Sequence, residues 1–231
     1  MSQTPIPTEQ ATPQELQVNL FFIFGQVFLL SISALLGFVI VSHLGPGINR
    51  GDQLTIPAKS RAKAGPALLT HIETYTSRGF SIYTVTTDGE PAIVALKPTS
   101  DTSNIDLNIL GHGSHVPHAE AAIRHLKNKS RSIAWSLPYT LPSRWAPALV
   151  TFAVHTINMV PKTNSPGHIP AYTSFTGLLP NFKKQAPHPF GITGFLQKSH
   201  GPTYNSSAAR ADYCVWLGTT RNQAGTHRCF N

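Results

Sequence analysis

The chain has 231 residues and a formal net charge of +8, yet only 12% of its residues are charged. The positive excess comes from a scarcity of acids, with 10 Asp and Glu against 18 Lys and Arg, so each carboxylate is a candidate for function. The 2 cysteines exclude a disulfide framework and a zinc site made of four cysteines. The length suffices for one domain with a sizeable core, and the basic balance suits a polyanionic partner such as nucleic acid.

Residues 1–15 are a polar, proline-rich leader that we expect to be disordered, and they lack the cationic start of a secretory signal. Residues 20–44 contain no Asp, Glu, Lys or Arg, and this apolar length satisfies the criterion for a membrane helix. Gly25 and Gly37, however, divide the stretch into pieces of strand length. We therefore predict three antiparallel strands at residues 18–24, 27–34 and 38–43, with a membrane span as the alternative.

Helices and strands follow in mixed order along the rest of the chain. We predict a loop at 45–66, a helix at 67–75, a strand at 80–87, a short helix from Pro91 to about residue 97 and a weak strand at 105–110. The strongest helix prediction is 118–135, where Glu120, Arg124, Lys127 and Arg131 recur at steps of four and three residues. A helix at 145–159 and one late strand at 213–217 complete an α/β order around one sheet.

Two carboxylates in this order are candidates for chemistry. Asp88 closes the strand at 80–87, and Glu120 lies in the first turn of the basic helix. Oxygen ligands from a strand end and a helix can bind divalent metals, and a pair of metals can act on a phosphodiester. Each residue also has a simpler interpretation, because Asp followed by Gly is a common turn pair and an acid suits the start of a helix.

Five segments in succession resemble the copia-type retrotransposon integrases, whose cores are of the retroviral integrase type. FSIYTVTTDGEP is similar to the strand that delivers the second catalytic aspartate, and HVPHAEAAIRHLKNKSRSI to the helix with the catalytic glutamate. LPYTLPSRWAPALVTFAVHTINMVP resembles the next helix, which contains a Trp and ends in an Asn near a Pro. SPGHIPAYTSFTGLLPNF and ADYCVWLGTTRNQAGTHRCFN are similar to the two segments that follow.

This resemblance implies an RNase H-like α/β fold: a central five-stranded mixed sheet, its first three strands antiparallel, with helices on both sides. It implies a catalytic core at residues 16–162 and a loop-rich, irregular C-terminal extension at 163–231 that contains a late strand. The zinc module, protease and reverse transcriptase of the family have no counterpart here, and the sequence ends inside the last similar segment. We expect a fragment of a decayed element with a truncated extension.

The resemblance also assigns the site. The family reaction is metal-dependent DNA strand transfer with 3′-end processing, in which a first-strand Asp shares one metal with Asp88 and a second with Glu120. Asn19 stands in the place of that first Asp, and we expect Glu15, on a different part of the strand, not to substitute for it. An amide offers one neutral oxygen in place of a bridging carboxylate. We therefore expect weak Mg²⁺ or Mn²⁺ binding and impaired catalysis.

DNA is the partner that the resemblance implies, with the nucleus as the location and a homo-oligomer left open. We predict phosphate contacts from Arg124, Lys127, Lys129 and Arg131, although a solvated basic face has the same pattern. Trp135 and Trp145 are expected to be core or interface aromatics and not platforms for base stacking. The alternative functions are a non-catalytic nucleic-acid-binding relic and a membrane-anchored protein that uses residues 20–44.

Overall fold

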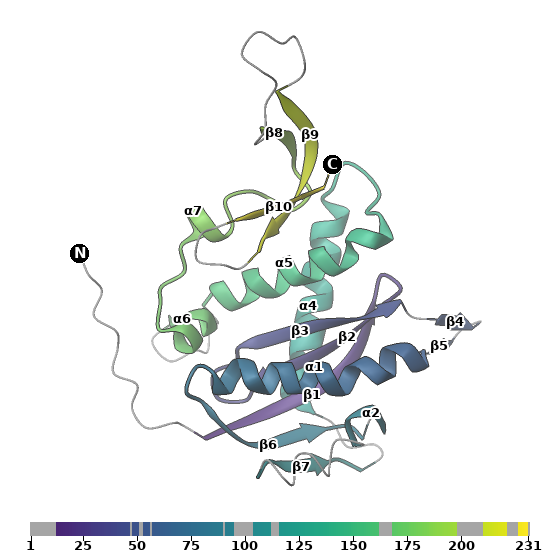
Figure 1. The fold of residues 1–231 in the computed structure, drawn as a ribbon, viewed down its shortest axis with the longest axis vertical. Coiled ribbons are helices and arrows are strands. Elements are labelled where there is room, and N and C mark those ends of the chain that lie inside the picture. The colour runs from purple at the N-terminus through teal and green to yellow at the C-terminus, as the bar shows by residue number, and fades with distance from the viewer. Residues whose placement is uncertain are drawn as a thin grey trace.

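The computed structural model describes residues 13–46, 48–50, 53–55, 57–89, 91–94, 104–111, 116–161, 168–197, 210–220 and 226–230. A five-stranded sheet at its centre has the order β3-β2-β1-β6-β7 (Figure 1). Its strands are β1 (Pro13–Ile23), β2 (Gln26–Ser33), β3 (Val39–Pro46), β6 (Ser81–Thr87) and β7 (Asp106–Ile109). β1, β2 and β3 are antiparallel neighbours, whereas β6 runs parallel to β1 and β7 parallel to β6. The predicted RNase H-like arrangement is confirmed.

The apolar stretch at residues 20–44 forms parts of β1, β2 and β3, as predicted, so the alternative of one helix across it is wrong. These strands are buried on both faces: Leu16 and Val18 belong to one core cluster, Phe21 and Ile23 to another. Burial on both faces explains why the sequence reads as nearly continuous apolar residues. In the described part of the chain, no helix combines the length and apolar character needed to cross a membrane.

β1 also corrects the predicted end of the leader. The strand begins at Pro13 and its residue Gln14 is buried, so residues 13–15 belong to the sheet. Ser33 Oγ of β2 donates a hydrogen bond to Gln14 Oε1, at 2.5 Å, which fixes the start of β1 against its neighbour. The remaining leader positions, residues 1–12, lie outside the described residues.

Helices cover both faces of the sheet. The main ones are α1 (Ala58–Thr76) on one face and α4 (Pro117–Trp135) with α5 (Ala146–Met159) on the other (Figure 1). α1 begins within the stretch that we predicted as a loop, because the small buried residues Ser60, Ala64 and Gly65 allow a close approach to the sheet. A Cβ on Gly45 of β3, where φ is +140°, would lie 3.0 Å from Ser60 Oγ. Helix and strand therefore meet where neither carries a large side chain.

The described residues also include several short elements. These are the paired strands β4 (Ile48–Arg50) and β5 (Gln53–Thr55), the helix α2 (Pro91–Val94) and the 3₁₀ helix η1 (Ser143–Trp145). α2 matches the short helix predicted from Pro91, although residues 95–97 lie outside the described part of the chain. β7 matches the weak strand predicted at 105–110.

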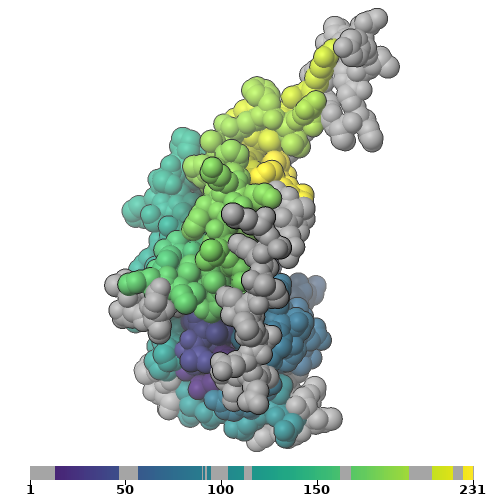
Figure 2. All heavy atoms as spheres, turned by 90° about the vertical axis from the view of Figure 1, so that its left-hand side faces the viewer, coloured from purple at the N-terminus to yellow at the C-terminus, as the bar shows by residue number. Residues whose placement is uncertain are grey.

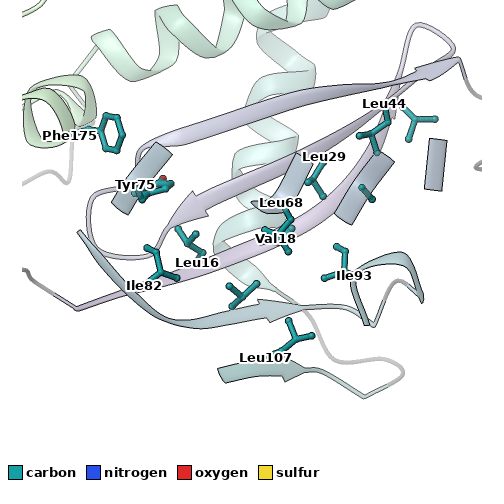
Figure 3. Close-up of a cluster of buried hydrophobic side chains, with 13 residues drawn as sticks. Leu16, Val18, Leu29, Leu44, Leu68, Tyr75, Ile82, Ile93, Leu107 and Phe175 are labelled. Atoms are coloured by element: carbon teal, nitrogen blue, oxygen red, sulfur yellow. The ribbon is translucent and has the colours of Figure 1, made fainter. Parts of the chain in front are cut away.

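The core between the sheet and α1 also contains Phe175, a residue from the later part of the chain (Figure 3). Leu29 of β2 and Leu68 of α1 are buried there together with Tyr75. The Tyr75 ring lies 5.1 Å from the ring of Phe175, and its hydroxyl donates a 2.7 Å hydrogen bond to the Phe38 carbonyl. Burial raises the pKa of Tyr75, so the hydroxyl stays a donor at every ordinary pH.

The C-terminal part is more regular than predicted. It consists of α6 (Ala171–Thr176), α7 (Phe182–Gln185), β8 (Thr193–Gln197), β9 (Ala211–Thr219) and β10 (His227–Phe230). The three strands form an antiparallel sheet of order β10-β9-β8, where we predicted a single late strand. Leu217 of β9 packs with Trp145, Leu149 and Phe190 in a third core cluster, which joins this sheet to α5. Figure 2 shows the C-terminal part, green to yellow, stacked along the long axis on the part with the central sheet.

Asn158 near the end of α5 protects the open edge of the central sheet. β3 is the last strand on that side, so part of its backbone has no further strand to pair with. The Val39 N–H donates to Asn158 Oδ1 at 3.0 Å, and Asn158 Nδ2 donates to the Val39 carbonyl at 2.8 Å. The side-chain amide thus pairs with β3 as a peptide group of a neighbouring strand would. This is the Asn that the sequence places near Pro161.

We expect Asn158→Ala to lower the free energy of unfolding by about 2–4 kcal/mol, because it leaves a buried backbone donor and a buried acceptor without partners. Urea denaturation followed by circular dichroism measures the change. Asn128→Ala, at an exposed position of α4, is the matched control and should change the stability little. Equal effects of the two substitutions would contradict the edge-protecting role of Asn158.

Candidate functional site

Asn19 lies within β1 beside the point where β6 ends. Val18 of β1 pairs with Thr87 of β6, and each is followed directly by a candidate residue, Asn19 and Asp88. Neighbouring strands lie about 4.8 Å apart, so the two backbones are close at this point. The Asn19 side chain is half-buried and that of Asp88 is exposed. Gly89, with φ +83°, turns the chain directly after Asp88, so the turn interpretation of this pair applies as well.

Glu120 and Asn19 line the same surface depression between β1 and α4. Its volume is about 380 Å³, and it is lined by Asn19, Leu20, Phe21, Phe22, Glu120, Ile123, Arg124 and Lys127. Asp88 is not among the lining residues, although it follows the strand position next to Asn19. Asn19 therefore lines the same depression as Glu120, and it lies beside Asp88 because the residues that precede the two are paired in the sheet. That all three converge on one metal site stays a prediction.

A chain of hydrogen bonds ties together the three elements that carry these residues. Thr86 Oγ1 of β6 donates to Glu15 Oε1 of β1 at 3.1 Å, and Gln17 Nε2 approaches the same oxygen at 3.4 Å. Gln17 Oε1 in turn accepts from the backbone N–H groups of His118 and Ala119, at 2.9 and 3.4 Å. These N–H groups belong to the first turn of α4, where the N-cap residue gives no side-chain hydrogen bond. The Gln17 side chain of β1 thus caps the N-terminus of α4.

Gln17 is the residue that sequence reasoning missed. Its side chain is 7% exposed, and its partners are 101 and 102 residues away along the chain. The available signal was the alternation of the polar residues Glu15, Gln17 and Asn19 with the apolar Leu16, Val18 and Leu20, which places all three polar residues on one face. Glu15 accepts a hydrogen bond from Thr86 and, like Asp88, does not line the depression. That Glu15 does not replace the missing Asp stays a prediction.

The basic residues of α4 lie on two sides of the helix. Arg124 and Lys127 line the depression beside Glu120, and Arg131 follows Lys127 after one further turn. Burial lowers the pKa of Lys127 and the nearby charge of Arg131 lowers it further, so a phosphate would relieve mutual repulsion here. Lys129 is about 180° around the helix from Glu120 at about 100° per residue, so it does not share this face. The single basic face predicted for all four residues is therefore reduced to three.

The residues at the depression fit a two-metal centre poorly. Asn19 offers a neutral oxygen, whereas paired divalent cations need bridging carboxylate charge to offset their repulsion. Across the described residues, no group of three or more His, Cys, Asp and Glu side chains is arranged to hold a metal ion. In the depression itself two cations face one carboxylate, a balance that suits an anion.

Comparison with known proteins gives a structural likeness only. No family model matches the sequence, and no curated protein matches it. The fold is similar to that of a solved integrase core. The catalytic core domain of BIV integrase matches 70% of this chain and 92% of its own, with a TM-score of 0.49 and 16% sequence identity. The function therefore has to be argued from the residues of the chain itself.

The two tryptophans expected in the core or in an interface differ in their surroundings. Trp145 is 8% exposed and packs edge-on against Tyr139 and Phe230, as predicted for a core aromatic. Trp135, the last residue of α4, is 88% exposed. The core interpretation is wrong for Trp135, because the residues next to it, Ala134 and Leu137, take the inward positions of this turn.

We expect Gln17→Met to keep the volume of the side chain but remove the acceptor for the first turn of α4, at a cost of about 1–2 kcal/mol in unfolding free energy. The backbone amides of His118 and Ala119 should exchange with deuterium faster, which mass spectrometry or NMR measures locally. Gln197→Met, at an exposed position of β8, is the control. Unchanged exchange at His118 in the Gln17 variant would show that the cap is not needed to hold α4.

Proposed function

We propose that the chain is an integrase-like DNA-binding protein of copia-type ancestry, whose strand-transfer site is impaired at position 19. One observation supports this most: a single hydrogen-bonded network joins β1, which carries Asn19, β6, which Asp88 follows directly, and α4, which carries Glu120. These are the three positions that the sequence resemblance assigns to the metal site. The resemblance rests on short motifs, whereas the network comes from residues outside those assignments.

The charge of the depression favours binding over cleavage. The family reaction depends on a first-strand carboxylate that bridges two metals, and Asn19 cannot supply its charge. Arg124 and Lys127 remain beside Glu120 and give the depression an excess of positive charge. Such a surface attracts a phosphate, but it opposes a pair of divalent cations. The non-catalytic alternative is therefore the form of the proposal that this site supports best.

DNA is the partner that fits this charge distribution. Arg124, Lys127 and Arg131 lie on neighbouring positions of one helix side and extend over about 10 Å at about 1.5 Å per residue. Each can contact a phosphate oxygen without reading the base sequence. Binding by this surface should therefore depend on salt and show little sequence preference.

We expect the unmodified chain to give no Mg²⁺-dependent nicking above a metal-free control, because the bridging carboxylate is missing. Asn19→Asp restores that charge with almost no change in volume, so it should strengthen Mn²⁺ or Mg²⁺ binding and recover nicking. Calorimetric titration measures metal binding, and a supercoiled plasmid reports nicking. Asn108→Asp, on the exposed side of β7, is the matched control and should gain neither.

Two results would contradict this part of the proposal in different ways. Robust nicking by the unmodified chain that Asp88→Ala abolishes would show that Asn19 does not impair the site. No gain in metal affinity with Asn19→Asp would show that position 19 is not at the metal site.

We expect the double substitution Lys127→Ala and Arg131→Ala to weaken duplex DNA binding for all sequences alike. The slope of log affinity against log salt should flatten by about one unit for each phosphate that the variant no longer neutralises. Fluorescence anisotropy over a series of salt concentrations measures both quantities. Lys129→Ala removes a charge from the other side of α4 and should leave the slope nearly unchanged. An affinity that does not depend on salt would refute a phosphate-binding role for this helix.

A further inference from the structure

We propose that Trp135 is a stacking platform for an unpaired base, so that α4 binds a single-stranded segment of DNA along its basic side. This inference rests on the proposed function, because it uses the same helix and the same phosphate contacts. It adds the class of nucleic acid that the surface prefers. It also reverses the expectation that Trp135 does not serve in base stacking.

The exposure of Trp135 is the first observation that supports this role. With 88% of its surface exposed, it is more accessible than any other large hydrophobic side chain among the described residues. Its ring is nevertheless carried on a fixed backbone, since Ile133, Ala134 and Leu137 pack against the core cluster around Trp145 and Leu149. An exposed indole on a packed backbone has only two side-chain torsions to fix, so it can bind a flat partner with a small loss of conformational entropy.

Its place on the helix is the second observation. Trp135 follows Arg131 by four residues and Arg124 by eleven, which places it about 40° and about 20° from them around the helix axis. The side of α4 that carries these residues therefore begins at Glu120 and the depression and ends at the indole, over roughly 22 Å. Stacked nucleotides rise by about 3.4 Å, so roughly six of them match this length.

The residue types on this side of α4 favour single-stranded DNA over a duplex. Cationic side chains that follow a backbone, together with an aromatic ring on which a base stacks, are the combination found in proteins that bind single strands. In an intact duplex the faces of the bases are covered by their neighbours, so the indole has nothing to stack on. Arg131 and Arg124 would contact either form of DNA, whereas Trp135 would contact only an unpaired base.

The test compares one single-stranded oligothymidylate, about twice the length of the surface, with a blunt duplex of similar length. Anisotropy is measured for the whole chain, for Trp135→Ala, for Trp135→Tyr and for Phe195→Ala. Phe195 is the matched control, because it is an aromatic residue that is 79% exposed and belongs to β8 and not to α4.

We expect Trp135→Ala to weaken single-strand binding by about tenfold or more, as loss of one stacked base does, with the duplex affinity unchanged within about twofold. The salt slope should stay the same, because no charge is removed. Trp135→Tyr should retain most of the affinity, and Phe195→Ala should bind both probes like the unmodified chain.

The other outcomes separate the two proposals. If the unmodified chain binds the duplex in a salt-dependent way but Trp135→Ala loses nothing on the single strand, the stacking role is wrong and the proposed function stands. If the unmodified chain binds neither probe at low salt, the proposed function fails and this inference fails with it. A dimer in sedimentation that Trp135→Ala dissociates, with single-strand affinity unchanged, would overturn the stacking role and assign the indole to an interface between copies.

Discussion

The contact between Gln17 and the start of α4 decides where every candidate functional residue of the helix lies. Apolar packing between a helix and a sheet is non-directional, so by itself it fixes neither the height nor the rotation of the helix closely. Hydrogen bonds from two adjacent backbone N–H groups to one acceptor oxygen are directional, so they constrain both the height and the rotation of the helix. This contact holds Glu120 at the depression that Asn19 also lines, and the basic positions that follow are placed by the regular turn of the helix.

The side chains that hold this region together are different from those assigned to its chemistry. Glu15, Gln17 and Thr86 form the hydrogen-bonded frame, whereas Asn19, Asp88 and Glu120 are the candidate ligands. A change at position 19 therefore alters the charge of the depression and leaves the frame in place. Because the Asn19 amide is neutral, the two cations Arg124 and Lys127 outnumber the one carboxylate, Glu120, among the residues that line the depression.

Much of the central fold could be predicted because its signals are local. Gly25 and Gly37 divide the apolar stretch into strands, and the regular spacing of charges identifies α4. The first half of α1 could not be predicted, since Gly65 and Pro66 weaken the helical signal and only the close approach to Gly45 explains why small residues are needed. β8 and β10 have five and four residues, too few for a clear alternation.

The candidate site was predictable only as far as sequence motifs extend. Asp88 and Glu120 were proposed from their positions at a strand end and in the first turn of a helix, and Asn19 from the family resemblance; that the three form one site stays a prediction. The cap from Gln17 and the pairing of Asn158 with Val39 join positions more than a hundred residues apart. Pairings of that separation leave no periodic trace, because each partner has an ordinary local sequence.

The residues that hold α4 and β6 in place are different from the residue that sets the charge at position 19, and this has a genetic consequence. Asn and Asp codons differ only by one purine at the first position, so a single transition would place a carboxylate at position 19. No compensating change in the surroundings would be needed, since Gln17, Glu15 and Thr86 already hold α4 and β6 beside it. A related chain without this frame would need several coordinated substitutions. Among related sequences, those that keep this frame are therefore the ones in which one substitution can place a carboxylate beside α4 and β6.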